Sequence, residues 1–213
     1  MAADPARLAD ARLYFVTDAS TSEHGLREAL AGGVDILQLR EKDASDEEVL
    51  TAAETFRAVC EEHRALFVVN DRPDLAVAAG ADGVHVGQDD EPVTAVRDRV
   101  GREILIGLST HSREQLAAAL ETDADYVCVG PVYATPTKPD YPAVGLELVR
   151  HAAETVTRPW FAIGGIDGAN VSEVAAAGAR GVVVVRAIRD APDARAAAAG
   201  LRAALEEAQP RVE

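Results

Sequence analysis

The sequence predicts an α/β fold, a single (β/α)8 TIM barrel that spans residues 1–213. Short apolar runs alternate with stretches of helical spacing, and this order produces a parallel sheet covered by helices. Eight such units in 213 residues give about 27 residues per unit, enough for one strand and one helix each. The first run lacks the G-x-G-x-x-G turn of a dinucleotide-binding sheet, so we favour a closed barrel over a doubly wound sheet.

The apolar runs are rich in Val, Ile and Leu and are almost continuously apolar. Parallel strands that are buried on both faces show this pattern, whereas half-exposed strands alternate apolar and polar residues. Because aromatic residues make up only 4% of the chain, we expect a core of Val, Ile, Leu and Ala. In chain order, the predicted strands cover residues 13–17, 36–40, 66–70, 83–87, 104–108, 126–130, 161–164 and 182–185.

Between these runs, Ala and Leu recur at helical spacing with Glu and Arg on the opposite face. The predicted helices include residues 46–63, 92–100, 113–122, 145–155, 169–178 and 193–208. Residues that favour helix N-termini precede several of them, namely Ser45 or Asp46, Ser112 and Asp167. Glycines that favour helix C-termini end several helical stretches, namely Gly32, Gly33, Gly80, Gly101 and Gly178.

The chain has a formal net charge of −15, which argues against nucleic acid as a partner because phosphate backbones require basic patches. This acidity fits either ordinary solubility or a salt-rich cytoplasm. No stretch reaches the roughly 18 apolar residues of a membrane span, and residues 1–12 contain no apolar signal segment. Cys60 and Cys128 form no spacing motif, so we interpret them as buried thiols of a cytoplasmic protein. A homo-oligomer is compatible with these features.

Charged residues follow several predicted strands, at the end of a barrel where active sites lie. Arg40 ends the second strand and Lys42 comes just after it, while Asp71 follows the third strand, Asp90 the fourth and Lys138 the sixth. The two lysines are the only ones in the chain, and both lie beyond strand ends. Mg²⁺ prefers one or two carboxylates together with phosphate oxygens, and Arg and Lys both bind phosphate. These residues therefore predict a site for a substrate diphosphate with Mg²⁺.

A second anion site is expected where the seventh and eighth predicted strands end. Gly164 ends the seventh strand and Gly165 follows it, and Val185 ends the eighth strand and Arg186 follows it. Glycines let backbone N–H groups approach a phosphate, and a following helix adds its dipole. Barrels commonly bind phosphate in these two loops. His85 lies inside the fourth predicted strand, and we interpret it as a core histidine.

Six motifs in this sequence resemble those of the thiamine-phosphate synthase family. They are Gln-Leu-Arg-Glu-Lys at 38–42, Asn-Asp at 70–71, Gly-Val-His-Val-Gly-Gln-Asp-Asp at 83–90, Gly-Leu-Ser-Thr-His at 107–111, Gly-Pro-Val-Tyr-Ala-Thr-Pro-Thr-Lys at 130–138 and Ile-Gly-Gly-Ile at 163–166. The resemblance runs from the first to the eighth predicted strand. It implies a transferase of thiamine biosynthesis that joins 4-amino-2-methyl-5-hydroxymethylpyrimidine diphosphate to 4-methyl-5-(2-phosphoethyl)thiazole and releases diphosphate.

The resemblance also implies a role for individual residues. Asp71 and Asp90 would ligate Mg²⁺, the implied cofactor, and Arg40, Lys42 and Lys138 would stabilise charge on the leaving diphosphate. The pyrimidine diphosphate would be held by Gln38, Arg40, Lys42, Asn70, Ser109 and Lys138. The thiazole phosphate would be held by Thr135, Thr137, Gly165 and the backbone at Val185 and Arg186. Glu41 and Pro136 complete the implied substrate-binding set.

One residue departs from the family pattern, because members commonly carry Ser at the position of Arg186. Backbone binding of the phosphate would tolerate arginine there, whereas binding through the Ser hydroxyl would require a rearranged pocket. A thiazole tautomerase-like isomerase on the same barrel is an alternative, but it would not need the charged set. A non-catalytic thiamine-phosphate-binding regulator stays open. A Schiff-base aldolase would need a lysine within a strand, and Lys42 and Lys138 both lie beyond strand ends.

Overall fold

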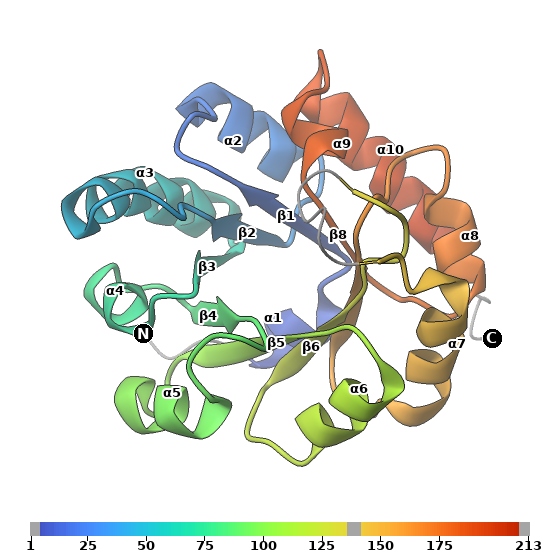
Figure 1. Ribbon diagram of the computed structural model, residues 1–213. Coiled ribbons are helices and arrows are strands. Elements are labelled where there is room, and N and C mark those ends of the chain that lie inside the picture. The colour runs from blue at the N-terminus through green and yellow to red at the C-terminus, as the bar shows by residue number, and fades with distance from the viewer. Residues whose placement is uncertain (1–4, 136–141, 209–213) are drawn as a thin grey trace.

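The structure is a computed structural model that describes residues 5–135 and 142–208. Within these residues, eight parallel strands form one closed barrel in which each strand pairs with its neighbours in sequence and the last pairs with the first. The helices lie outside this barrel (Figure 1). The predicted (β/α)8 barrel is therefore confirmed.

The barrel strands begin and end within one or two residues of the predicted positions. In order they are β1 (Leu13–Thr17), β2 (Ile36–Leu39), β3 (Leu66–Asn70), β4 (Gly83–Val86), β5 (Leu105–Thr110), β6 (Tyr126–Val129), β7 (Trp160–Ile163) and β8 (Val182–Val184). The largest difference is at β5, which was predicted to end at residue 108. It continues because Ser109 and Thr110 pair with Cys128 and Val129 of β6, a contact that local hydrophobicity does not reveal.

The helices of the described chain are α1 (Pro5–Asp10), α2 (Glu23–Ala31), α3 (Asp46–His63), α4 (Pro73–Ala78), α5 (Val93–Val100), α6 (Arg113–Leu120), α7 (Gly145–Thr155), α8 (Val171–Ala176), α9 (Arg186–Arg189) and α10 (Ala194–Glu207). The predicted caps Ser45 and Ser112 are confirmed, since their side chains accept backbone N–H bonds of α3 and α6. The predicted cap Asp167 is wrong. Asn170 precedes α8, and the Asp167 carboxylate instead accepts from the N–H of Ala169 within the preceding turn.

The core has two parts, because buried strands present alternate residues to opposite sides. One cluster lies between the strands and the outer helices and consists mainly of Val, Leu, Ile and Ala. The other fills the barrel interior and includes Tyr14, Tyr126 and Phe161, whose rings meet edge to face. The expected aliphatic core is thus confirmed outside the barrel, whereas aromatic rings occupy part of its centre.

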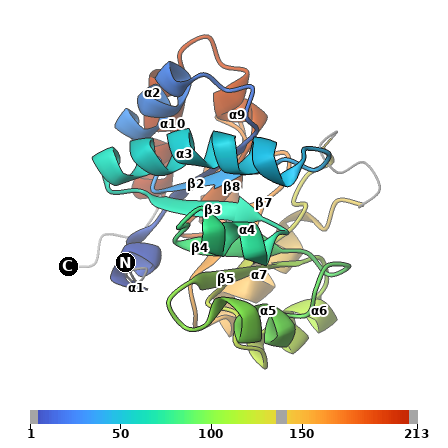
Figure 2. The same cartoon turned by 90° about the vertical axis from the view of Figure 1, so that its left-hand side faces the viewer.

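Helix α1 closes the end of the barrel at which the strands begin. Leu8 of α1 is buried and belongs to the interior cluster together with Ala11 and Tyr14. Figure 2 shows α1 at the end of the barrel opposite the loops that follow the strands. The interior is therefore accessible from the C-terminal ends of the strands.

Three aspartates stand immediately before alternate strands and bind the backbone of the strand before them. Asp82 accepts a hydrogen bond from the N–H of Phe67 at 2.8 Å, and Asp125 accepts one from the N–H of Ile106 at 2.7 Å. Asp35 accepts two such bonds near the start of β1. These carboxylates satisfy backbone donors at the start of strands and so help to fix the barrel opposite its functional end.

Gly107 of β5 is the point where the barrel interior has no room for a side chain. A Cβ atom there would lie 2.2 Å from Cζ of Tyr126 and 2.4 Å from Nδ1 of His85. We expect Gly107→Ala to lower the free energy of unfolding by about 1–3 kcal/mol through overpacking, measured by urea denaturation. The same change at Gly200 of α10, where a Cβ would meet open space, is the control. An unchanged urea midpoint for Gly107→Ala would contradict this packing.

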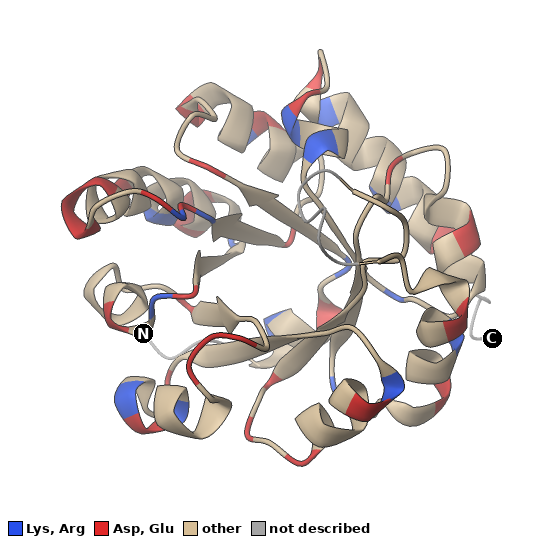
Figure 3. Cartoon of the chain, viewed as in Figure 1, with Lys and Arg blue, Asp and Glu red and all other residues tan. Residues whose placement is uncertain are grey.

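Charges lie on the outer helices and in the loops, and none of the described strands contains Asp, Glu, Lys or Arg (Figure 3). Cys60 and Cys128 are both buried free thiols, as expected. Among the described residues, no helix has the length and apolar character needed to cross a membrane.

Candidate active site

A cavity of about 590 Å³ opens at the C-terminal ends of the strands. Every strand contributes to its lining, as barrel active sites require, and its volume suits a small organic substrate. Eleven of the predicted site residues line it: Gln38, Arg40, Lys42, Asn70, Asp71, Asp90, Ser109, Thr135, Gly165, Val185 and Arg186. The structure thus brings residues from most strand ends together in one place.

Buried polar side chains form the floor of this cavity. Gln38, Asn70 and Ser109 are buried near the ends of β2, β3 and β5. Each lies two residues after an interior apolar residue or glycine of its strand, so strand alternation directs its side chain inward. Because polar groups buried without partners are costly, this placement indicates either internal hydrogen bonds or a polar ligand.

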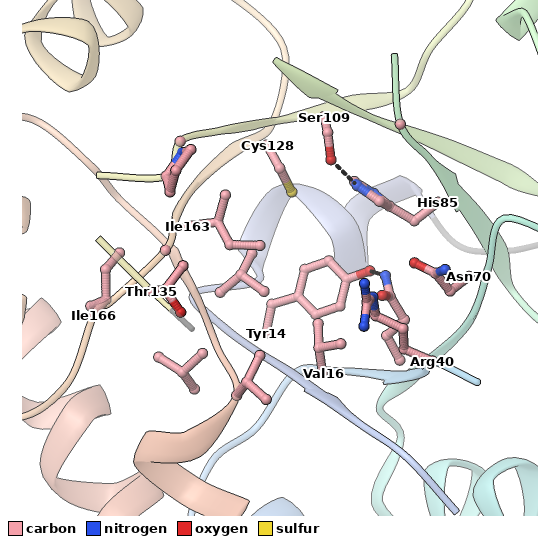
Figure 4. A pocket seen from close by; sticks show the side chains of 18 of the residues that line it. Tyr14, Val16, Arg40, Asn70, His85, Ser109, Cys128, Thr135, Ile163 and Ile166 are labelled. Carbon is pink, nitrogen blue, oxygen red and sulfur yellow. Dashed lines mark hydrogen bonds between the residues drawn. The ribbon is translucent and has the colours of Figure 1, made fainter. Parts of the chain in front are cut away.

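Two of the floor residues, Gln38 and Ser109, belong to a connected set of hydrogen bonds. The amide nitrogen of Gln38 donates to the hydroxyl of Tyr14 at 2.5 Å, and the hydroxyls of Tyr14 and Tyr126 lie 3.0 Å apart. Nδ1 of His85 lies 3.3 Å from the Tyr126 hydroxyl, and its Nε2 lies 2.9 Å from Oγ of Ser109. Figure 4 shows His85 next to Ser109 and the ring of Tyr14 in the cavity. His85 is buried as predicted, but it also lines the cavity.

Charged side chains form the rim. Arg40 and Lys42 follow β2, Asp71 follows β3 and Asp90 follows β4. The backbone holds both carboxylate segments in place. The N–H of Asp71 donates to the carbonyl of His85 at 2.8 Å, and the carboxylate of Asp90 accepts from the N–H of Gly87 at 2.6 Å. The rim therefore combines cations with two fixed carboxylates.

The two carboxylates are close enough to perturb one another. Burial raises the pKa of Asp71 to about 6, and the charge of Asp90 and a hydrogen bond to it act in the same direction. Asn70 and the nearby Arg40 oppose this rise. A bound cation would relieve the repulsion between two carboxylates. The donor set therefore fits a hard divalent cation that also takes ligand oxygens from a substrate.

Backbone groups line the opposite side of the cavity. Gly164 and Gly165 have φ values of 103° and 66°, a region that glycine adopts readily. A Cβ at Gly165 would lie 2.8 Å from that of Tyr133, so the loops after β6 and β7 pack closely there. The side-chain amide of Asn170 donates to the carbonyl of Gly165 at 2.8 Å. The glycine pair therefore allows these two loops to pack closely, and Gly165 lines the cavity together with Val185 and Arg186.

Four predicted site residues are not placed in the cavity. Glu41 does not line it, because its carboxylate accepts a hydrogen bond from the N–H of Ala19 at 2.7 Å and links the loops after β2 and β1. Pro136, Thr137 and Lys138 lie outside the described residues.

Sequence reasoning assigned no site role to several residues that line the cavity. Tyr14, Gln88, Asp89 and Cys128 are among them. The alternation within β1 and β6 was the available signal, because Tyr14 and Cys128 occupy interior positions of otherwise apolar strands. A phenol or a thiol in such a run is also typical of an ordinary core, so the sequence alone did not distinguish them.

The fold and the site define a barrel enzyme with a cationic and carboxylate-bearing mouth suited to phosphorylated substrates. The family model described as thiamine monophosphate synthase matches residues 13–188. The chain belongs to this family, which confirms the resemblance seen in its motifs.

Individual relatives agree along almost the whole chain. A thiamine-phosphate synthase of Acidothermus cellulolyticus is 52% identical over 206 residues, which cover 94% of this chain and 97% of the relative. One from Mycobacterium leprae is 54% identical over 217 residues, with 93% and 92% covered. The solved structure of thiamine phosphate pyrophosphorylase from Pyrococcus furiosus has a TM-score of 0.88 at 36% identity, and the match covers 97% of this chain and 99% of that one.

Proposed function

We propose that this chain joins 4-amino-2-methyl-5-hydroxymethylpyrimidine diphosphate to 4-methyl-5-(2-phosphoethyl)thiazole and forms thiamine phosphate and diphosphate. Its relatives are named for the formation of thiamine phosphate. One observation carries the proposal within this chain. Arg40, Lys42, Asp71 and Asp90, which follow three different strands, line one cavity together with the buried amide of Gln38.

We also propose Mg²⁺ as the cofactor, held by Asp71 and Asp90. In the part of the chain that the structure describes, no group of three or more His, Cys, Asp or Glu could hold a metal. Substrate phosphate oxygens and water would therefore complete the coordination shell, as is usual for Mg²⁺. When bound, Mg²⁺ would neutralise negative charge on the diphosphate and assist its departure.

The side chains of the β2 loop would stabilise the same leaving group. Arg40 offers a planar fork to phosphate oxygens, and Lys42 offers a compact charge. The bond between the pyrimidine methylene carbon and the diphosphate oxygen breaks, and its electron pair leaves with the diphosphate. The lone pair of the thiazole nitrogen forms the new carbon–nitrogen bond. No proton needs to move, so the protein's task is to position both rings and stabilise charge.

The thiazole phosphate would bind on the glycine side of the cavity. Gly165, Val185 and Arg186 line the cavity there, and the backbone N–H groups near Val185 and Arg186 would donate to the phosphate oxygens. Backbone donors do not depend on the side chain, which is consistent with arginine at position 186. Thr135 lines the same cavity and would contact this substrate.

The proposal predicts that purified protein releases diphosphate only when both substrates and Mg²⁺ are present. Diphosphate and thiamine phosphate should form in equal amounts, and EDTA should abolish both until Mg²⁺ is restored. The measurement is a coupled diphosphate assay with chromatography of the thiamine product, with each substrate omitted in turn.

The other outcomes of this assay select the alternatives. Conversion of a thiazole phosphate without the pyrimidine or Mg²⁺ would identify a tautomerase-like isomerase. Tight binding of thiamine phosphate without turnover would identify a regulator. The cytoplasmic location, the lack of a nucleic-acid partner and a homo-oligomeric state stay predictions of the sequence.

A further inference from the structure

We propose that five hydrogen-bonded side chains form a relay. The direction of its hydrogen bonds makes the pocket floor bind an aminopyrimidine in preference to an oxopyrimidine. The relay consists of Gln38, Tyr14, Tyr126, His85 and Ser109. Tyr14, Tyr126 and His85 would be positioning residues, because they act through the two end members. This inference rests on the proposed function, since it takes the pyrimidine as the ligand of the floor.

The relay joins five of the eight strands of the described barrel. Its members come from β2, β1, β6, β4 and β5 in that order, and all five are buried. Tyr14 and Tyr126, separated by 112 residues, meet through their hydroxyls. Gln38 and Ser109, the two ends, line the cavity, as do Tyr14 and His85, whereas Tyr126 is not among the lining residues.

The pairing register of the strands places these contacts in the barrel interior. Gly107 pairs with His85 on one side and with Tyr126 on the other. Because it has no side chain, the phenol of Tyr126 and Nδ1 of His85 can occupy the space in front of it. The glycine is therefore part of what allows the relay to form.

The hydrogen bonds have a direction that propagates from one end to the other. The amide nitrogen of Gln38 can only donate, so the Tyr14 hydroxyl accepts from it and donates its single proton to Tyr126. Tyr126 then donates to Nδ1 of His85, which leaves the imidazole proton on Nε2. His85 donates that proton to the oxygen of Ser109.

The two phenols keep their protons under ordinary conditions. Burial raises the pKa of both Tyr14 and Tyr126 well above the usual tyrosine value. Each therefore supplies one proton and accepts another, as a directional chain requires.

The end members then present a defined pattern to the cavity. Gln38 can accept with its carbonyl oxygen, and Ser109 can donate its own hydroxyl proton. An aminopyrimidine has the matching groups, because its amino group donates and its ring nitrogens accept. An oxopyrimidine has a carbonyl and a protonated ring nitrogen instead. To bind it in the same way, Gln38 would have to rotate its amide and every bond of the relay would have to reverse.

The first test measures the tautomer of His85 in the unliganded protein. Long-range ¹H–¹⁵N NMR should show the proton on Nε2, with Nδ1 unprotonated. Tyr126→Phe should give a mixture of the two tautomers, because Nδ1 loses its donor. Tyr133→Phe is the control. It removes the hydroxyl of a tyrosine outside the relay, which donates to Glu173, and should leave the tautomer of His85 unchanged. A wild-type His85 with its proton on Nδ1 would overturn the proposal, and this measurement needs no variant.

The second test measures specificity without chemistry. The pyrimidine alcohol and its 4-oxo analogue lack the diphosphate, so their dissociation constants report on the floor alone. Calorimetry should show that the wild type prefers the amino compound on the order of tenfold or more, because the mismatched analogue leaves buried polar groups unpaired. We expect Tyr126→Phe to reduce the preference to about threefold or less.

Tyr14→Phe interrupts the relay at another point. It replaces Tyr126→Phe in the binding measurement if Tyr126→Phe does not fold. A folded variant of either tyrosine that keeps the wild-type preference would contradict the relay. A failure of the proposed function would be seen in a separate assay, if the wild type formed no thiamine phosphate when both substrates were supplied. The His85 tautomer would still report on the relay in that case.

Discussion

Asp71→Asn should lower kcat/KM for the pyrimidine diphosphate by about a thousandfold, because the removal of one preorganised electrostatic group costs 10²- to 10³-fold or more. The substitution keeps the shape of the side chain but removes one of the two carboxylates at the rim. The proposed Mg²⁺ site would retain Asp90 alone, so the apparent Mg²⁺ requirement should shift to higher concentration. Steady-state diphosphate release over a Mg²⁺ titration measures both effects.

A matched control is available next to this site. Asp74 lies in α4 and pairs with Arg99, with its side chain 73% exposed. Asp74→Asn removes the same charge from the same region and should leave kcat/KM unchanged. If Asp71→Asn turns over at the wild-type rate with an unchanged Mg²⁺ requirement, the metal assignment is wrong.

Arg40→Gln is expected to produce the other large loss, a decrease in kcat of roughly 10²- to 10³-fold. Arg40 lies beside Asp71 and its backbone N–H donates to the carbonyl of Thr17 at 2.8 Å, so its position at the rim is fixed. Arg40→Lys keeps the charge but loses the planar fork. It should therefore recover only part of the lost rate.

The dissociation constant of the pyrimidine alcohol separates charge stabilisation from ring binding. This ligand has no diphosphate, so Arg40→Gln should bind it as the wild type does. Arg57→Gln is the control for a lost surface charge, because Arg57 forms an exposed pair with Glu61 on α3. Weak alcohol binding with unaltered kcat in Arg40→Gln would show that Arg40 binds the ring and not the leaving group.

Local patterns were sufficient to predict the strands, most helices and the charged rim. The rim could be predicted because parallel strands of a barrel all end on the same side, so residues such as Asp71 and Asp90 converge without knowledge of the register. The Asp167 cap was wrong because the Asp167 carboxylate bonds within the turn that precedes α8, and Asn170, which stands before the helix, makes no side-chain capping bond.

The relay in the floor could not be predicted in the same way. The contact between Tyr14 and Tyr126 depends on the register of strands that are distant in the chain and on the space in front of Gly107. For Glu41, in contrast, the sequence predicted a site role that the structure does not show. It lies within a matching motif, but its carboxylate binds the backbone of Ala19 instead of the cavity.

Helix α1 also limits how molecules can enter and leave the barrel. Because Leu8 closes the end where the strands begin, reactants and products have to use the same opening at the other end of the barrel. In the proposed complex, a ring held against the buried Gln38 and Ser109 would lie deeper than a phosphate beside Gly165, which is partly exposed. In the proposed reaction the pyrimidine would therefore have to enter before the thiazole phosphate, and thiamine phosphate, which contains both rings, would leave as one molecule through the same opening.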